Sequence, residues 1–92
     1  MTKANLSRAI LRDANLGGAN LTDTKLNNAY LRNTDLTGAN LQDADLTAAF
    51  LTDSNMTGAN LHGTDFAHAT LNDVIGADFT GALNVPSRYL KD

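Results

Sequence analysis

The sequence contains no cysteine, no tryptophan, no glutamate and a single proline among its 92 residues. Without cysteine, disulfides, thiolate metal sites and a cysteine nucleophile are excluded. The missing glutamate argues against an α-helical fold, because glutamate is among the better helix formers. A chain of this length forms one small domain that buries less than about 70% of its unfolded surface. A deep catalytic cleft is therefore not expected.

Charge and long apolar runs are also scarce. Seven Lys and Arg stand against ten Asp, which gives a net charge of −3. The basic residues are few and scattered, which argues against nucleic-acid binding. No run approaches the ~18 apolar residues of a membrane span, and the N-terminus lacks the apolar core of a signal peptide. We therefore expect a cytoplasmic protein with no membrane association. A leader peptide that had already been removed would not be visible in this sequence.

What the sequence has in excess is Ala, Leu, Asn and Thr, arranged in a five-residue repeat. Fourteen units run in frame over residues 4–73, with Leu at the third place of twelve units and Ala at the first place of ten. An α-helix would rotate successive leucines by about 140°, and a straight strand would alternate them between faces. The period therefore predicts a chain that turns a corner every unit, with first and third places inside.

Outward places resemble one another at a lag of twenty residues, as Gly18, Gly38 and Gly58 do. Four units per turn are therefore predicted, with neighbouring turns ~4.8 Å apart. Leu6 and Leu11, in the first turn, are expected to be exposed. The predicted core consists of the third-place residues Leu16, Leu21, Leu26, Leu31, Leu36, Leu41, Leu46, Leu51, Met56, Leu61, Phe66 and Leu71.

The tandem run Ala-(Asn/Asp)-Leu-x-x resembles the pentapeptide-repeat family over about three quarters of the chain. This resemblance implies an all-β fold, a right-handed quadrilateral β-helix, here of about four turns. Some members of that family resemble double-stranded DNA and bind type II topoisomerases, whereas many others have no assigned activity. The resemblance therefore predicts the fold more firmly than the function.

The repeat is interrupted near the C-terminus. A repeat domain is predicted over residues 1–81, in frame over 4–73, with a break at 74–76 and an out-of-frame unit at 77–81. Residues 82–92 are predicted to form a C-terminal cap, in which Pro86 suits the first position of a short helix. The first turn has no such cap and should expose an unpaired edge. Two expectations follow for that edge, namely self-association or a place within a longer solenoid.

The four sides are numbered by their second-place residues, beginning at 5, 10, 15 and 20 for sides one to four. Side two carries an outward apolar stripe beside arginines, residue types enriched where binding energy concentrates. The competing interpretation is that the stripe only stabilises the stack. The candidate interface consists of Ile10, Tyr30, Phe50, Arg12 and Arg32, and the candidate acidic surface of Asp23, Asp43, Asp45 and Asp65.

The sequence favours a non-catalytic structural or interaction module with no cofactor, no metal site and no catalytic residue. His62 and His68 occupy outward places on different sides, where little desolvation is expected. The partner is an unidentified protein or a second copy, bound through the first turn or the Ile10, Tyr30 and Phe50 face. Two alternatives stay open. One is a DNA mimic that binds a type II topoisomerase, and the other is a spacer within a larger chain.

Overall fold

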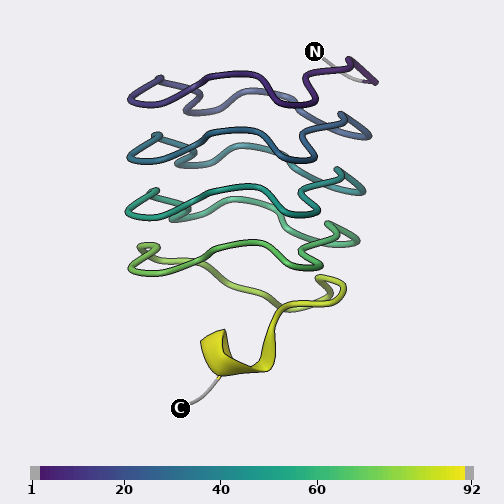
Figure 1. Ribbon diagram of the computed structural model, residues 1–92, viewed down its shortest axis with the longest axis vertical. Helices are drawn as coiled ribbons and strands as arrows, with labels where there is room; N and C mark the ends of the chain where they lie inside the picture. The colour runs from purple at the N-terminus through teal and green to yellow at the C-terminus, as the bar shows by residue number, and fades with distance from the viewer. Residues whose placement is uncertain (1–2, 91–92) are drawn as a thin grey trace.

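The computed structural model describes residues 3–90 and consists of rectangular turns stacked along one axis, with dimensions of 33 × 23 × 22 Å. The chain descends from the N-terminus as a right-handed coil (Figure 1). Residues 1–2 and 91–92, which the sequence assigned to the repeat domain and the cap, lie outside the described residues. The predicted right-handed quadrilateral β-helix is therefore confirmed.

Successive turns are joined by single-residue parallel bridges between second places twenty residues apart, such as Ile10 with Tyr30 and Tyr30 with Phe50. The Tyr30 N–H donates to the Ala9 carbonyl at 2.9 Å, and the Leu11 N–H donates to the Tyr30 carbonyl at 2.8 Å. These bonds recur on all four sides. They fix the lag of twenty that the outward residues predicted.

The fifth place of each unit forms the corner and adopts a left-handed backbone. Its φ lies between 55° for Asn33 and 73° for Gly58. Asp, Asn and Gly tolerate this region better than other residues do. They fill eleven of the fourteen fifth places, while Arg8, Ala48 and His68 fill the rest. The high Asp, Asn and Gly content of this place is therefore explained by the backbone conformation of the corner.

The second place is shaped by a local hydrogen bond. The side-chain oxygen of Asn or Asp accepts the backbone N–H two residues later, as in Asn15 with Gly17 at 3.0 Å and Asp45 with Thr47 at 2.9 Å. Such turns favour Asn and Asp. The apolar second places of side two cannot make this bond, so a different reason must account for them.

The core is a column of third-place side chains. Eleven of the twelve predicted core residues are buried, with exposed fractions between 0% and 2%. The exception is Leu16, which we predicted in the core but which is only partly buried. Leu6 and Leu11, which we predicted to be exposed, are also partly buried. These leucines belong to the first turn, which stacks on a described turn from one side alone. Inward hydroxyl groups donate hydrogen bonds to backbone carbonyls, as Ser54 Oγ does to the Leu31 carbonyl at 2.5 Å.

The regular stack ends later than the sequence indicated. Val74 and Ile75 continue it, because Ile75 forms a parallel bridge with Asn55. The departure begins at Gly76, where a Cβ atom would lie 3.0 Å from the Thr57 Cα atom and φ is 68°. Leu83 then pairs with Asp65 at a lag of eighteen, so the last turn is two residues short.

The C-terminal segment closes the lower end of the stack (Figure 1). The 3₁₀ helix η1 spans Ser87–Tyr89, and Pro86 is its N-cap instead of its first residue, which corrects our placement. The Tyr89 hydroxyl donates to Asn72 Oδ1 at 2.7 Å. The Phe79 ring meets the buried Phe66 ring edge-on, with centroids 5.5 Å apart. Among residues 3–90, no helix is long and apolar enough to cross a membrane.

Candidate interaction surface

Side two presents three large apolar side chains in one column. Ile10, Tyr30 and Phe50 have exposed fractions of 69%, 44% and 39%. The bridges between their backbones align them, and the Tyr30 and Phe50 rings stack at a centroid distance of 5.2 Å and an interplanar angle of 8°. Because Ala and Leu occupy the inward places of these units, the column can only point outward.

Arg12 and Arg32 lie in the neighbouring fourth-place column and are exposed. Ile10, Arg12 and Tyr30 line a shallow hollow of about 210 Å³. The structure thus brings the five residues of the candidate interface onto one side. The stacked rings supply local stabilisation, yet they leave a substantial part of their surface in water.

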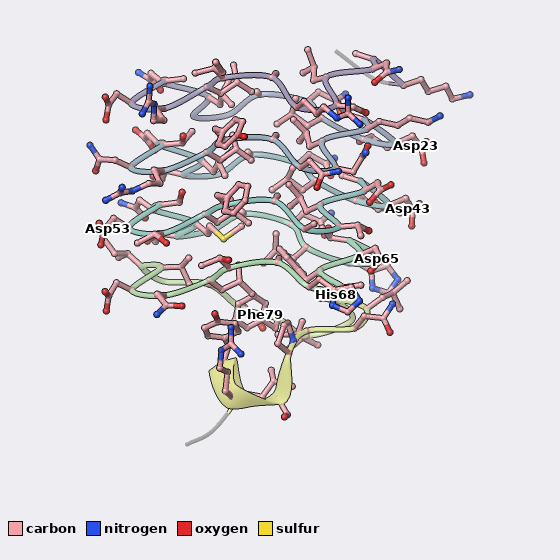
Figure 2. All side chains as sticks on the ribbon, in the orientation of Figure 1. Asp23, Asp43, Asp53, Asp65, His68 and Phe79 are labelled. Carbon is pink, nitrogen blue, oxygen red and sulfur yellow. The ribbon has the colours of Figure 1, made fainter. Side chains whose placement is uncertain are left out.

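The four acidic residues that we selected lie at one edge of the rod, and each also has a local structural role. Asp23 and Asp43 are corner residues with φ of 59° and 60°. Asp65 accepts the Ala67 N–H at 3.0 Å, as Asp45 accepts that of Thr47. Figure 2 shows Asp23, Asp43 and Asp65 along one edge, with Asp53 at the opposite edge. Their presence is therefore explained without a ligand.

The pKa values of two carboxyl groups are lowered, and both shifts have local causes. Hydrogen bonds from the Thr37 hydroxyl and N–H lower the pKa of Asp35, and those from Thr80 lower the pKa of Asp78. Asp78 is exposed and Asp35 is half-buried. Over residues 3–90, no three His or Asp side chains are grouped so as to hold a metal ion.

The distribution of charge along the rod was not predicted from the sequence. Between Arg32 and Arg88 there is no Lys or Arg, but there are seven Asp. Five of the seven basic residues precede Asp35. The rod is therefore basic toward its first turns and acidic toward its last, and counting charges along the stacked turns would have revealed it.

Stacked five-residue units with flat, solvent-facing sides define a quadrilateral β-helix solenoid. The family model for pentapeptide repeats matches residues 1–38, 14–53 and 34–73, with eight copies of the repeat. The chain belongs to the pentapeptide-repeat family. No protein with a curated description matches it.

Several solved structures share the fold. Rfr23, a pentapeptide-repeat protein from the cyanobacterium Cyanothece 51142, is 31% identical over 90% of this chain and 62% of its own, with a TM-score of 0.51. The alr5209 protein from Nostoc PCC 7120 is 28% identical over 88% of this chain and 80% of its own, with a TM-score of 0.52. This chain thus spans about three fifths of the length of Rfr23.

A trypsin-treated variant of QnrB1, a plasmid-mediated fluoroquinolone resistance protein, is 22% identical. The match covers 86% of this chain and 52% of that chain, with a TM-score of 0.55. At this identity the likeness concerns the fold alone.

Proposed function

We propose that this protein is a non-catalytic interaction module, a rigid rod that presents side two to a protein partner. The observation that carries the proposal is the column of Ile10, Tyr30 and Phe50, whose exposure persists although two of its rings are stacked. Exposed apolar patches edged by polar residues are typical of interaction sites. Aromatic residues and Arg are also the usual centres of binding energy.

The place of these residues in the repeat supports the proposal. Ten second places hold an Asn or Asp that accepts a backbone N–H two residues later. Ile10, Tyr30 and Phe50 forgo that bond and expose apolar surface instead. The missing hydrogen bond and the exposed apolar surface are both unfavourable in water. A partner that covers side two would remove the apolar surface from water, which supports an interaction role for these residues.

The test is affinity capture from a native lysate with the full chain and the Tyr30→Asp/Phe50→Asp variant. Asn20→Asp/Asn40→Asp is the matched control, because it places the same two charges at second places of side four, where Asp fits the local turn. We expect a protein that is retained by the wild type and the control and lost by the side-two variant. Equal retention by all three baits, or no specific protein on any, would overturn the proposal, and the latter favours a spacer.

The acid-rich last turns favour a second candidate, DNA mimicry toward a type II topoisomerase. Duplex DNA carries one charge per 1.7 Å, or about 19 along 33 Å. The net charge of this chain is −3, so a match is confined to the turns that follow Arg32. A supercoiling assay tests this candidate. Inhibition that Asp43→Asn/Asp45→Asn/Asp65→Asn relieves supports mimicry, and no inhibition at large protein excess excludes it.

A further inference from the structure

We propose that side two binds a second copy of this chain, with the two rods antiparallel. Their two-fold axis runs across the rods, between the turn that carries Tyr30 and the turn that carries Phe50. The inference rests on the proposed function in one respect, since it takes side two as the interaction surface. It adds the partner and the geometry.

The charged residues of side two are unevenly ordered along the rod. In the fourth-place column, Arg12 and Arg32 occupy the first two turns, and in the adjacent corner column, Asp53 and Asp73 occupy the last two. The Asp53 N–H donates to the Asn72 carbonyl at 3.1 Å, which keeps these columns stacked in register. All four charged side chains are exposed. Asp13 also lies in the corner column of the first turn, where its carboxylate accepts a hydrogen bond from Asn33 Nδ2 at 2.9 Å. The first two turns of side two therefore carry a net charge of +1, and the last two carry −2.

With the two-fold axis across the rods, the first turn of one copy lies opposite the fourth turn of the other, and the second turn lies opposite the third. Arg32 then lies level with the second copy's Asp53, one column away. Arg12 lies level with the second copy's Asp73, which also meets Asp13 of the corner column. Tyr30 covers the second copy's Phe50 at the centre. Because the contact is isologous, every favourable pair occurs twice. A parallel arrangement would place Arg32 beside its own copy and gain no such pairing.

The size of side two suits a weak, reversible dimer. Four turns spaced ~4.8 Å apart and a width of 23 Å give side two an area of roughly 440 Å². Standard interfaces bury about 800 Å² per partner. The apolar centre of Ile10, Tyr30 and Phe50, with charged residues around it, matches the usual division into core and rim.

Side one is the alternative dimer interface, because its second places also change from basic to acidic along the rod, from Lys25 to Asp45 and Asp65. Its second-place column lacks an apolar centre. Among the described residues, its exposed large apolar side chain is Leu83, which pairs with Asp65 beyond the turns that would meet. The apolar column thus selects side two.

The experiment is sedimentation equilibrium of the full chain and of two single variants, Arg32→Asp and Asp53→Arg. Each homodimer would then oppose like charges twice, and we expect dissociation constants raised about tenfold or more. An equimolar mixture of the two variants restores both opposite-charge pairs, so it should dimerise like the wild type. Arginine fits the corner at residue 53, because Arg8 adopts φ of 64° at the same place.

Lys25→Asp is the control, since it makes the same charge change on side one at a place where Asp45 and Asp65 stand in the next turns. We expect it to leave the dimer intact. The inference would be overturned if the wild type stayed monomeric at all concentrations or formed open-ended oligomers. It would also be overturned if either single variant dimerised as tightly as the wild type, if the mixture stayed monomeric, or if only Lys25→Asp weakened the dimer. A monomeric wild type that still captures another protein through side two leaves the proposed function standing.

Discussion

At the scale of single residues, the repeat is a set of backbone requirements. Fifth places need a left-handed φ, most second places carry a side-chain acceptor, and first and third places need to fit inside the coil. The period of five predicts the inward places. It does not reveal the left-handed corner, whose signal was the concentration of Asp, Asn and Gly at one place of each unit.

The corner requirement leads to a matched pair of substitutions. Ala48→Gly should raise the free energy of unfolding by about 1 kcal/mol, because Ala48 has φ of 59° and a side chain is disfavoured there. Gly38→Ala should lower it by about the same amount, since φ is 68° and an added Cβ meets no atom within 4 Å. Urea denaturation measures both. Changes of the same sign would contradict the corner account.

The lowered pKa of Asp35 makes a prediction about acid stability. The native carboxylate binds protons less readily than the unfolded one, whose pKa is near 3.8. Its contribution is therefore complete above that value and lost as the pH falls through the native pKa. Asp35→Asn keeps an acceptor oxygen, as Asn15 and Asn55 show on the same side. We expect similar stability at pH 7 and a smaller loss at acid pH, measured by thermal denaturation across pH.

At the scale of the turn, stability comes from stacking leucines between neighbours on both sides. Leu41→Ala should cost about 2–5 kcal/mol, because Leu41 is fully buried. Leu11→Ala, in the first turn, should cost less than about 2 kcal/mol, since Leu11 is partly buried. Chemical denaturation compares the two. Equal losses would show that the first turn is covered as completely as the others.

The C-terminal segment is the part of the fold that the sequence predicted least well. The frame is lost after Ile75, and the register of eighteen between Asp65 and Leu83 depends on hydrogen bonds that no five-residue pattern encodes. The rest of the stack was predictable because each unit repeats the same requirements. Leu16 was assigned to the core because we expected only Leu6 and Leu11 of the first turn to lack cover, whereas all three are partly buried.

The cap itself has a testable role. Phe79→Ala removes the ring that meets the buried Phe66 edge-on, so it should uncover the last core layer and cost about 2–4 kcal/mol. Hydrogen exchange should rise in the last turn more than in the second. Uniform exchange along the stack, with unchanged stability, would show that the segment does not close the core.

At the scale of the whole molecule, the rod has two kinds of asymmetry. Apolar surface gathers on side two, and charge changes from basic to acidic along the axis. The sequence predicted the first from three residues at a lag of twenty. The second was missed because charges were compared across sides and not along turns, although it is what makes an antiparallel pair complementary.

Side two is where two copies of this protein are expected to associate. The most direct measurement is a dilution series followed by backbone amide chemical shifts. We predict concentration-dependent shifts confined to side two, centred on residues 29–33 and 49–53, and little change on side four at residues 39–43. Shifts centred on side four or on the ends of the rod, or no change on dilution, would contradict the account.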